Sequence, residues 1–414
     1  MIFTGFSPNL TGRDALKALG WLFLPWNWKK LAKGGNVEKA ERELEKYFGV
    51  KNALAFDSGR TALYFALKAL DVKQGDEVLV QAFTCVVVAN AIRWTRAKPV
   101  YVDARDDFNM DPEDLQKKIS PKAKVIIIQH TFGLPADMEK IMALADKYGL
   151  RVVEDCAHSF GARHGGRLTG TIGDIGMFSF GSDKILSCGR GGALITDNAE
   201  LYQKLKQYQS GLEPLTGKDI TRHLLHFPVF YIGKPLYGLF IGKAVLWLAK
   251  KMYFVNRIIT QKEKTGEKDE LFGRLLPNAL AGILLGQLKD VDSMNKQRRK
   301  TAALYDTEIS EKIERPLVKA ANKDECVYLR YPILTDRPKE LMKDAKRHKI
   351  ILGDWYDSVI APRDLRMDKT GYEKGSCPRA ELLSERIVNL PTDRNVNEKK
   401  ARRVAEVVNR WVNG

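Results

Sequence analysis

Short apolar strands alternate with amphipathic helices along the first part of this chain, and this alternation restricts the possible folds most. The spacing of apolar residues predicts four strands, at 76–81, 98–103, 124–129 and 151–155. Helices are expected around them, at 37–49, 59–70, 86–94, 112–119 and 136–150. Such strands are typical of βαβ units in a parallel sheet that helices cover on both faces. Ligands of these sheets bind at the carboxyl ends of the strands, and Asp155 lies at one such end.

The later part of the chain follows a different pattern. Residues 279–309 predict one long helix, and the residues after 325 predict a strand, a helix, a second strand and a second helix, as in a small α+β domain. We therefore expect four parts. They are an apolar and aromatic N-terminal extension (1–36), a large α/β domain (37–212), a basic aromatic insert with its linker (213–274), and a connecting helix with a small C-terminal domain (275–414).

The cysteines and the N-terminal residues indicate in which compartment the protein is located. The chain of 414 residues has five cysteines, an odd number, and no CxxC pair. A disulfide framework or a zinc site is not expected, so we predict no metal and a reducing, cytoplasmic location. The first residues carry no basic leader ahead of an apolar core and do not predict a signal peptide. The net charge of +17 leaves nucleic acid, anionic lipid and phosphorylated substrates open as partners.

One lysine stands in an unusual setting. Lys184 lies within GMFSFGSDKILSCGRGG, residues 176–192, among glycines, serines and aromatic residues. A lysine becomes a nucleophile when desolvation or nearby positive charge lowers its pKa, and these surroundings meet that need. Enzymes that use pyridoxal phosphate hold its aldehyde on such a lysine as a Schiff base, and a carboxylate, here Asp155, keeps the pyridine nitrogen protonated. The alternatives are a solvated loop lysine and an aspartate that only caps a helix.

The phosphate of that cofactor also needs a site. Helix N-termini supply unpaired N–H donors and the positive end of the helix dipole. The segment DSGRTALYFAL places Ser58, Gly59 and Arg60 at the start of a predicted helix. Ser179, in the predicted strand before the lysine, adds a hydroxyl group. These residues predict a phosphate site beside the lysine.

Several segments together identify a family. They are SGRTAL, QAFTCVVVANAI, the block from TFGLPADMEK to GDIGMFSF, DKILSCGRGGALIT and GYEKGSCPRAELLSERIVNLP. Across about 37–212 and 275–412 the chain resembles the DegT/DnrJ/EryC1/StrS family of pyridoxal phosphate-dependent sugar aminotransferases. The resemblance implies the fold-type I architecture of aspartate aminotransferase, with a parallel-rich sheet and a homodimer whose active sites lie at the subunit boundary. It also implies a keto-sugar substrate, nucleotide-linked, and an amino acid donor such as glutamate.

The resemblance implies roles for the residues singled out above. Lys184 would bind the cofactor covalently and move a proton during catalysis, so it is the expected catalytic residue. Asp155 would bind the pyridine nitrogen. Ser179, Gly59 and Arg60 would surround the phosphate, although the family has threonine where this chain has Arg60.

Two further residues take cofactor positions through the resemblance alone. His158 stands where the family contacts the pyridine ring or its 3′ oxygen, and a half-buried structural histidine is the alternative. Phe83 stands for the aromatic residue that stacks on the ring, and ordinary core packing is its alternative. The family motif Gly-Glu-Gly-Gly appears here as GRGG, so Arg190 reverses a charge; its role stays open.

The insert combines positive charge with aromatic residues. Residues 215–259 carry seven lysines or arginines and one acid, Asp219. Charges interrupt every apolar run, and Pro228 and Pro235 are expected to break helices, so the segment is not expected to span a bilayer. With residues 21–30, it is typical of a segment that lies in the interface of an anionic membrane. The alternative is an extra helical layer packed on the protein or across a dimer.

The sequence bears on three other functions as well. No nucleic-acid-binding motif is present, so nucleic acid is not expected as a partner. A family member with another pyridoxal phosphate reaction is one alternative, and a membrane-bound scaffold that keeps the fold without turnover is another. If the membrane hypothesis holds, the sugar could be lipid-linked and the enzyme would lie on the inner face of the membrane, in surface glycan or polysaccharide biosynthesis.

Overall fold

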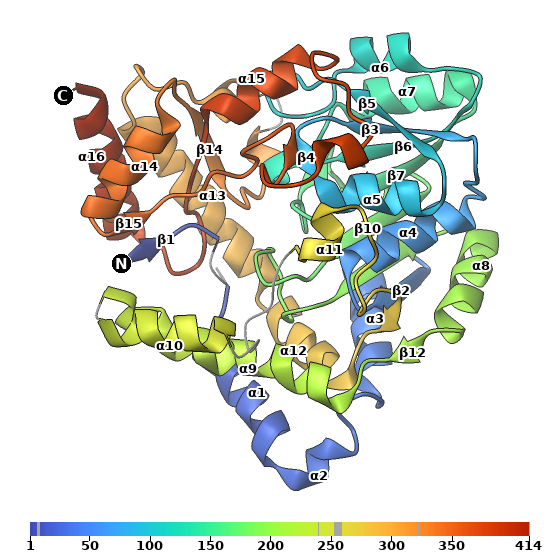
Figure 1. Ribbon diagram of the computed structural model, residues 1–414, viewed down its shortest axis with the longest axis horizontal. Helices are drawn as coiled ribbons and strands as arrows, with labels where there is room; N and C mark the ends of the chain where they lie inside the picture. The colour runs from blue at the N-terminus through green and yellow to red at the C-terminus, as the bar shows by residue number, and fades with distance from the viewer. Residues whose placement is uncertain (6–8, 239, 252–258, 321–322, 414) are drawn as a thin grey trace.

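The computed structural model describes residues 1–5, 9–238, 240–251, 259–320 and 323–413 (Figure 1). Its centre is a nine-stranded sheet in the order β12 (Glu213–Pro214), β13 (Arg274–Leu275), β2 (Asn52–Phe56), β11 (Gly192–Thr196), β10 (Ile175–Ser179), β7 (Arg151–Asp155), β6 (Ala123–Gln129), β3 (Glu77–Gln81) and β5 (Lys98–Val102). Strands β5, β3, β6, β7 and β10 pair in parallel, whereas β11 is antiparallel to β10 and to β2. The sheet is therefore mixed and mostly parallel, and it contains the four strands predicted at 76–81, 98–103, 124–129 and 151–155.

Helices cover both faces of this sheet. They are α3 (Asn36–Phe48), α4 (Gly59–Ala69), α5 (Val86–Trp94), α6 (Pro112–Lys118), α7 (Met138–Tyr148) and α8 (Ala199–Ser210). Side chains of a strand alternate between faces. Ile127 of β6 accordingly packs in the core that includes α4 and α5, whereas Ile126 and Ile128 pack in a second core with α7. This two-sided burial explains why the strands are apolar along their whole length.

The C-terminal elements form a smaller assembly beside the sheet (Figure 1). They are β14 (Tyr331–Leu334), α14 (Pro338–Arg347), α15 (Pro378–Arg386), β17 (Ile387–Leu390) and α16 (Glu398–Asn413), and β14 pairs with β17 antiparallel. The single helix predicted at 279–309 is two helices, α12 (Asn278–Leu288) and α13 (Val291–Glu308). The break falls at Asp290, which precedes α13 and binds Arg13 at 2.7 Å.

Short elements complete the chain. Besides β14 and β17, three further strand pairs of the described residues stand outside the large sheet: β1 (Ile2–Phe3) with β15 (Ile350–Ile351), β4 (Thr84–Cys85) with β16 (Ile360–Ala361), and β8 (Arg163–His164) with β9 (Arg167–Leu168). The short helices are α11 (Gln261–Lys264), η1 (Thr131–Gly133), η3 (Pro316–Lys319), η4 (Lys323–Glu325) and η5 (Met367–Lys369). The parallel pair of β4 and β16 joins the large sheet's side of the molecule to the C-terminal elements.

The insert and the N-terminal extension lie together at one end of the molecule (Figure 1). The extension forms α1 (Gly12–Phe23) and α2 (Pro25–Trp28), and the insert forms α9 (Gly217–Gly233), η2 (Pro235–Gly238) and α10 (Phe240–Lys251). Helix α9 packs against α1, α10 and α12. Residues 239 and 252–258 of the predicted insert lie outside the described residues.

The expectation that Pro228 breaks a helix is wrong. Pro228 lies inside α9, whereas Pro235 begins η2 after α9 has ended. A proline inside a helix removes one backbone hydrogen bond, and tertiary packing can outweigh that loss. Here Pro228 is buried between Phe227 and Phe230, which face the core. Burial of this face against α1 and α12 maintains the helix through the proline.

Candidate active site

The carboxyl ends of three strands meet at one edge of the sheet. Strands β2, β7 and β10 run in the same direction, because β2 and β10 are both antiparallel to β11. Asp155 ends β7, Ser179 ends β10, and α4 begins at Gly59 shortly after β2. A pocket at this edge is lined by Lys184, Asp155, Ser179, Gly59 and Arg60. The structure thus brings together five of the predicted site residues.

Lys184 lies in the loop between β10 and β11, with its side chain only 14% exposed. Its amide donates a hydrogen bond to the carbonyl of Gly181 at 3.2 Å, and its Nζ lies 3.5 Å from Oδ2 of the buried Asp183. The loop therefore directs this lysine into the pocket, and the alternative of a solvated loop charge does not fit its burial.

Asp155 presents a buried carboxyl group to the same pocket. Its Oδ1 accepts a hydrogen bond from the amide of Ala157 at 3.0 Å. Burial raises the pKa of Asp155, and the amide of Ala157 and the charge of Lys184 only partly offset that rise. A buried carboxylate with a raised pKa is stabilised by a cation placed beside it, which suits a partner that carries a proton on nitrogen.

A close contact forms the wall opposite these residues. A β-carbon on Gly59 would lie 2.8 Å from the β-carbon of Ser179, so only glycine fits there. Ser58 caps α4, and its hydroxyl accepts a hydrogen bond from the amide of Thr61 at 3.3 Å. Because α4 begins at Gly59, its N-terminus lies beside the Ser179 hydroxyl, an arrangement that suits a phosphate group.

Two arginines beside this wall pair with buried acids of the same chain. Arg60 forms an ion pair with Glu263 of α11, a segment that the sequence predicts only as a hydrophilic linker. The Nε of Arg190 donates to Oδ2 of Asp57 at 2.9 Å. Burial, together with the charge of Arg190, lowers the pKa of Arg60 to about 10. The positive charges introduced by SGR and GRGG are therefore compensated inside the protein.

His158 and Phe83 lie behind the pocket, and neither is among the described residues that line it. The Nδ1 of His158 accepts a hydrogen bond from the amide of Phe132 at 3.3 Å, which leaves Nε2 to donate to the hydroxyl of Tyr356 at 3.4 Å. Burial lowers the pKa of His158 well below its ordinary value. Phe83 is fully buried, with its ring 5.3 Å from that of Tyr356. Their direct contact with a cofactor stays a prediction.

Other residues of the pocket wall are not among the predicted site residues. Tyr356 and Trp355 come from the C-terminal part, Cys85 from β4, and His223 from α9 of the insert. Burial raises the pKa of the Cys85 thiol, so the thiol stays protonated. Cys85 follows Phe83 closely in QAFTCVVVANAI, and this proximity was the one available signal. The other three residues come from distant parts of the chain.

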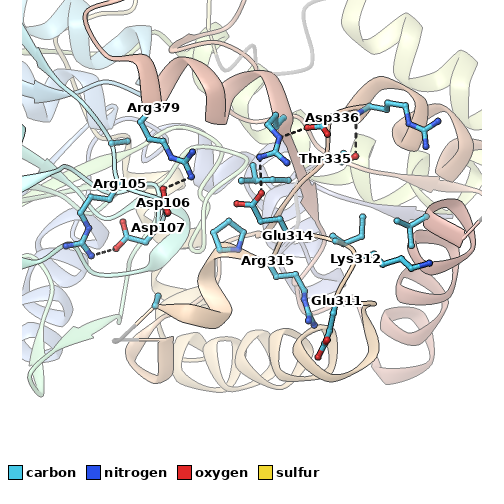
Figure 2. Close-up of a pocket in the computed structure, with 18 of the residues that line it drawn as sticks. Arg105, Asp106, Asp107, Glu311, Lys312, Glu314, Arg315, Thr335, Asp336 and Arg379 are labelled. Atoms are coloured by element: carbon cyan, nitrogen blue, oxygen red, sulfur yellow. Dashed lines mark hydrogen bonds and ion pairs between the residues drawn. The ribbon is translucent and has the colours of Figure 1, made fainter.

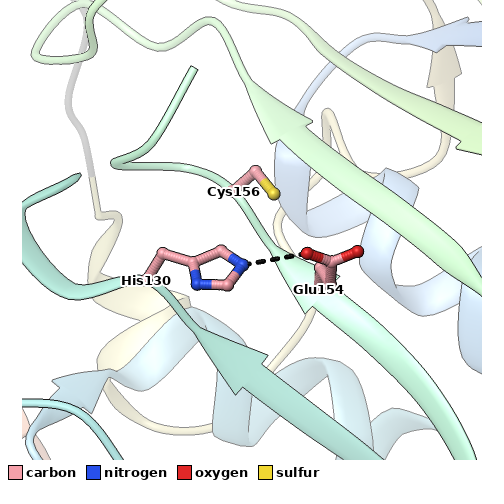
Figure 3. Close-up of side chains that lie close together, drawn as sticks. All are labelled: His130, Glu154 and Cys156. Atoms are coloured by element: carbon pink, nitrogen blue, oxygen red, sulfur yellow. Dashed lines mark hydrogen bonds and ion pairs between the residues drawn. The ribbon is translucent and has the colours of Figure 1, made fainter. Parts of the chain in front are cut away.

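A buried cluster of His130, Glu154 and Cys156 lies next to Asp155 (Figure 3). The Nε2 of His130 lies 3.1 Å from Oε2 of Glu154, and His130 Nδ1 accepts the amide of Ala136. Amides of residues 170, 172 and 173 donate to the two oxygens of Glu154 at 2.7–2.8 Å. Burial raises the pKa of the Cys156 thiol well above its ordinary value. The histidine and carboxylate atoms are thus used in hydrogen bonds that hold the 170–173 turn.

A wider groove lies where the large sheet's loops face the C-terminal part (Figure 2). Several of its charged residues pair with one another. Arg105 binds Asp107 at 2.9 Å, and Arg386 binds Glu314 at 2.9 Å and Asp336 at 2.8 Å. The groove contains none of the predicted site residues. Solvated pairs of this kind contribute little stability each, and they give the groove no clear ligand chemistry.

A buried lysine and carboxylate that face a helix N-terminus, at the carboxyl edge of a mixed sheet, define a fold-type I enzyme dependent on pyridoxal phosphate. The comparison with known families agrees. The chain belongs to the DegT/DnrJ/EryC1/StrS aminotransferase family, whose model matches residues 25–224 and 249–409. It is therefore an aminotransferase that uses pyridoxal phosphate, and sugar aminotransferases are its relatives.

Three similar proteins illustrate these relationships. GDP-perosamine synthase of Escherichia coli O157:H7 is 28% identical over 98% of this chain and 97% of its own length. The UDP-N-acetyl-3-dehydro-alpha-D-glucosamine 3-aminotransferase of Acidithiobacillus ferrooxidans is 30% identical over 92% of this chain and 90% of its own. The crystal structure of S. venezuelae DesV with a ketimine intermediate has a TM-score of 0.75 at 26% identity, covering 97% of this chain and 95% of that one.

The residues of the pocket fit this cofactor. Asp155 offers a buried carboxylate for a protonated ring nitrogen, and its raised pKa would return toward its ordinary value beside that charge. Gly59 leaves the first turn of α4 open beside Ser179. Lys184 lies in the same pocket as both. Each part of the cofactor thus has a chemically matched group within one pocket.

Proposed function

We propose that this enzyme transfers an amino group from an amino acid such as glutamate to a nucleotide-linked keto-sugar, in the biosynthesis of a surface glycan or polysaccharide. The joint presence of Lys184, Asp155 and the Gly59–Ser179 contact in one pocket carries the proposal. The names of two relatives, a GDP-perosamine synthase and a UDP-sugar 3-aminotransferase, support the nucleotide-linked sugar.

Each group has a proposed task in this chemistry. Pyridoxal phosphate supplies an electron sink when it is bound. Lys184 holds the cofactor and then carries a proton on Nζ to and from the substrate carbon, which its place inside the pocket allows. Asp155 keeps a proton on the ring nitrogen, and the α4 amides with Ser179 bind the phosphate. Tyr356 and Trp355 close one wall and reduce the access of water.

Arg60, His158 and Phe83 have supporting tasks in this proposal. Arg60 lines the pocket and balances the phosphate charge while Glu263 holds its guanidinium. His158 and Phe83 contact the pyridine ring of the cofactor in this proposal, and the rings of both lie beside that of Tyr356 in the pocket wall. A homodimer with active sites at the subunit boundary also belongs to the proposal, as does the division into parts 1–36, 37–212, 213–274 and 275–414.

An assay of sugar products tests the proposal. The purified enzyme with pyridoxal phosphate and L-glutamate is given GDP-, UDP- and dTDP-linked keto-sugars, and mass spectrometry looks for the amino-sugar. We expect one nucleotide class to yield product, and Lys184→Ala to yield none. Cofactor turnover by glutamate without any sugar product would favour another acceptor or reaction. The absence of any reaction with a panel of amino acids would favour the scaffold alternative.

We also propose that the enzyme works at the inner, cytoplasmic surface of an anionic membrane. The supporting feature is an aromatic end, formed by the exposed residues Leu16, Phe23, Leu24, Trp26 and Trp28 of the extension and Tyr231, Ile232, Trp247 and Leu248 of the insert. Trp26 is 69% exposed and Trp247 is 63% exposed. Exposed tryptophans gathered at one end of a molecule are typical of an interaction surface.

The charge beside the aromatic end fits anionic lipid. Lys29, Lys30, Lys243 and Lys251 are exposed there, and the Nζ of Lys251 lies 5.2 Å from the ring centre of Trp247. Lysine next to tryptophan is typical of segments that lie in a lipid interface. Among the helices that the structure describes, none has the length and apolar character to cross a bilayer. The proposal is accordingly binding to the surface.

Flotation with vesicles tests this partner. Wild type should float with phosphatidylglycerol vesicles and not with phosphatidylcholine vesicles. The double variant Trp26→Ser/Trp247→Ser should remain at the bottom of the density gradient with both kinds of vesicle. Tyr148→Ser is a matched control, because Lys147 lies over this exposed ring at the same 5.2 Å. Failure of wild type to float would refute the membrane proposal. A change of oligomeric state in the tryptophan variant would instead assign the aromatic end to contact between subunits.

A further inference from the structure

A residue of the N-terminal extension binds the backbone of the active-site loop. The side-chain amide of Asn9 donates a hydrogen bond to the carbonyl of Lys184 at 2.9 Å and a second one to the carbonyl of Ile185. Asn9 is 1% exposed, so water does not compete for these bonds. The contact joins residues that lie 175 positions apart in the chain.

Asn9 is itself held from the other side. Its Oδ1 accepts a hydrogen bond from Nη2 of Arg298, a fully buried residue of α13, at 2.9 Å. The other terminal nitrogen of Arg298 donates to the carbonyl of Leu329 at 3.0 Å and to the hydroxyl of Thr392 at 3.1 Å. A continuous chain of hydrogen bonds therefore runs from the C-terminal part through Arg298 and Asn9 to Lys184.

We propose that Asn9 is a positioning residue for Lys184. The lysine lies on a loop without regular structure, and a catalytic side chain must keep its place within a fraction of an ångström. Asn9 uses its side-chain N–H donors to hold two consecutive backbone carbonyls, those of Lys184 and Ile185. The proposal rests on the proposed role of Lys184, and it assigns to the extension a task in the active site.

The chemistry of asparagine predicts which substitution is informative. Asn9→Asp keeps an oxygen for Arg298 but replaces the two N–H donors with an acceptor that faces two carbonyl groups. The contact with Arg298 is thereby retained while the contact with the lysine loop is lost. A mere loss of folding stability would not be confined to the loop that carries Lys184.

Asn109 provides a matched control in another part of the molecule. It is also 1% exposed, its amide donates to the carbonyls of Leu134 and Pro135 at 3.3 Å, and its Oδ1 accepts the amide of Thr131. Asn109→Asp thus removes two amide-to-carbonyl contacts of the same kind and keeps the acceptor oxygen, in a loop that lies outside the pocket lining.

The experiment follows covalent attachment of the cofactor. Three proteins are compared: wild type, Asn9→Asp and Asn109→Asp. Each is mixed with pyridoxal phosphate, and samples are reduced with borohydride at intervals. The samples are then digested, and mass spectrometry measures the fraction of Lys184 that carries the cofactor. We expect Asn9→Asp to bind the cofactor roughly tenfold more weakly and to trap it more slowly, with a similar loss in kcat. Asn109→Asp should match wild type, and melting curves should show all three proteins folded.

Each outcome has one meaning. Equal attachment in folded Asn9→Asp and wild type would overturn the positioning role, and so would an equal loss in both variants. If wild type itself attaches no cofactor at Lys184, the proposed function fails instead. The two failures are therefore distinguishable.

Discussion

Gly59 and Ser179 approach each other so closely that a β-carbon on residue 59 would lie 2.8 Å from the β-carbon of Ser179. They come from α4 and β10, and α4 packs directly on β10 and β11. Neither residue can move without shifting its helix or strand, because both elements belong to the buried core around the sheet. The start of α4 and the end of β10 therefore act as one fixed wall.

Substitution of Gly59 should disturb that wall. We expect Gly59→Ala to destabilise the protein by about 2 kcal/mol, as overpacking does, and to weaken binding of pyridoxal phosphate. Gly217→Ala is the control, since Gly217 also begins a helix but an added β-carbon there meets no described atom within 4 Å. Denaturant melts and cofactor titration measure both effects. Equal cofactor affinity in the two variants would place the phosphate elsewhere.

Asp155 should make the cofactor-free protein less stable as the pH rises. Burial raises the pKa of this carboxyl group, so the folded protein holds the proton more tightly than the unfolded chain does. The resulting stability is present at acid pH and is lost as the pH rises through the raised pKa. Asp155→Asn removes this titration. The cofactor-free variant should melt at or above the wild-type temperature near neutral pH, while transamination falls by about 100-fold or more.

Thermal melts across the acid to neutral range and an activity assay measure the two effects of Asp155→Asn together. Asp174→Asn is a suitable control, since Asp174 binds Arg151 away from the pocket. Full activity in Asp155→Asn would contradict its cofactor role. A large loss of stability near neutral pH would contradict the direction of its pKa shift.

His158 should make the protein sensitive to acid. Burial lowers the pKa of His158 well below its ordinary 6.5, and it lowers that of the buried His226 to about 3. As the pH falls below 6.5, the unfolded chain takes up protons that the folded protein excludes, so stability falls by up to about 1.4 kcal/mol per pH unit for each histidine. His158→Gln should reduce this slope, which urea melts at stepped pH measure. An unchanged slope would contradict the prediction, and the half-exposed His348→Gln serves as the control.

The pair of Arg60 and Glu263 should link stability to the phosphate. Glu263 is fully buried, so Glu263→Gln leaves the charge of Arg60 without its carboxylate and should destabilise the cofactor-free protein by about 3 kcal/mol. Bound phosphate supplies a replacement charge, so saturating pyridoxal phosphate should reduce that loss. Melts with and without cofactor measure the difference. An equal loss in both conditions would show that Arg60 does not serve the phosphate.

The sequence allowed prediction of the sheet and the central residues because their signals are local. Asp155 follows a buried strand, Gly59 begins a helix, and Lys184 lies in a segment of unusual composition. Glu263, Tyr356 and Asn9 act through contacts with distant parts of the chain, and no local pattern indicates such contacts. The prediction that Pro228 breaks a helix is wrong because tertiary packing of α9 outweighs the local tendency of proline to interrupt helices.

The central claim is that Lys184 carries the cofactor and that glutamate donates the amine. Visible absorption spectra of wild type and Lys184→Ala, with pyridoxal phosphate before and after L-glutamate, test it most directly. We predict a cofactor band that depends on Lys184 and that glutamate converts to the spectrum of the pyridoxamine form. A band in wild type that is equally strong in Lys184→Ala, or no band in either protein, would contradict the account.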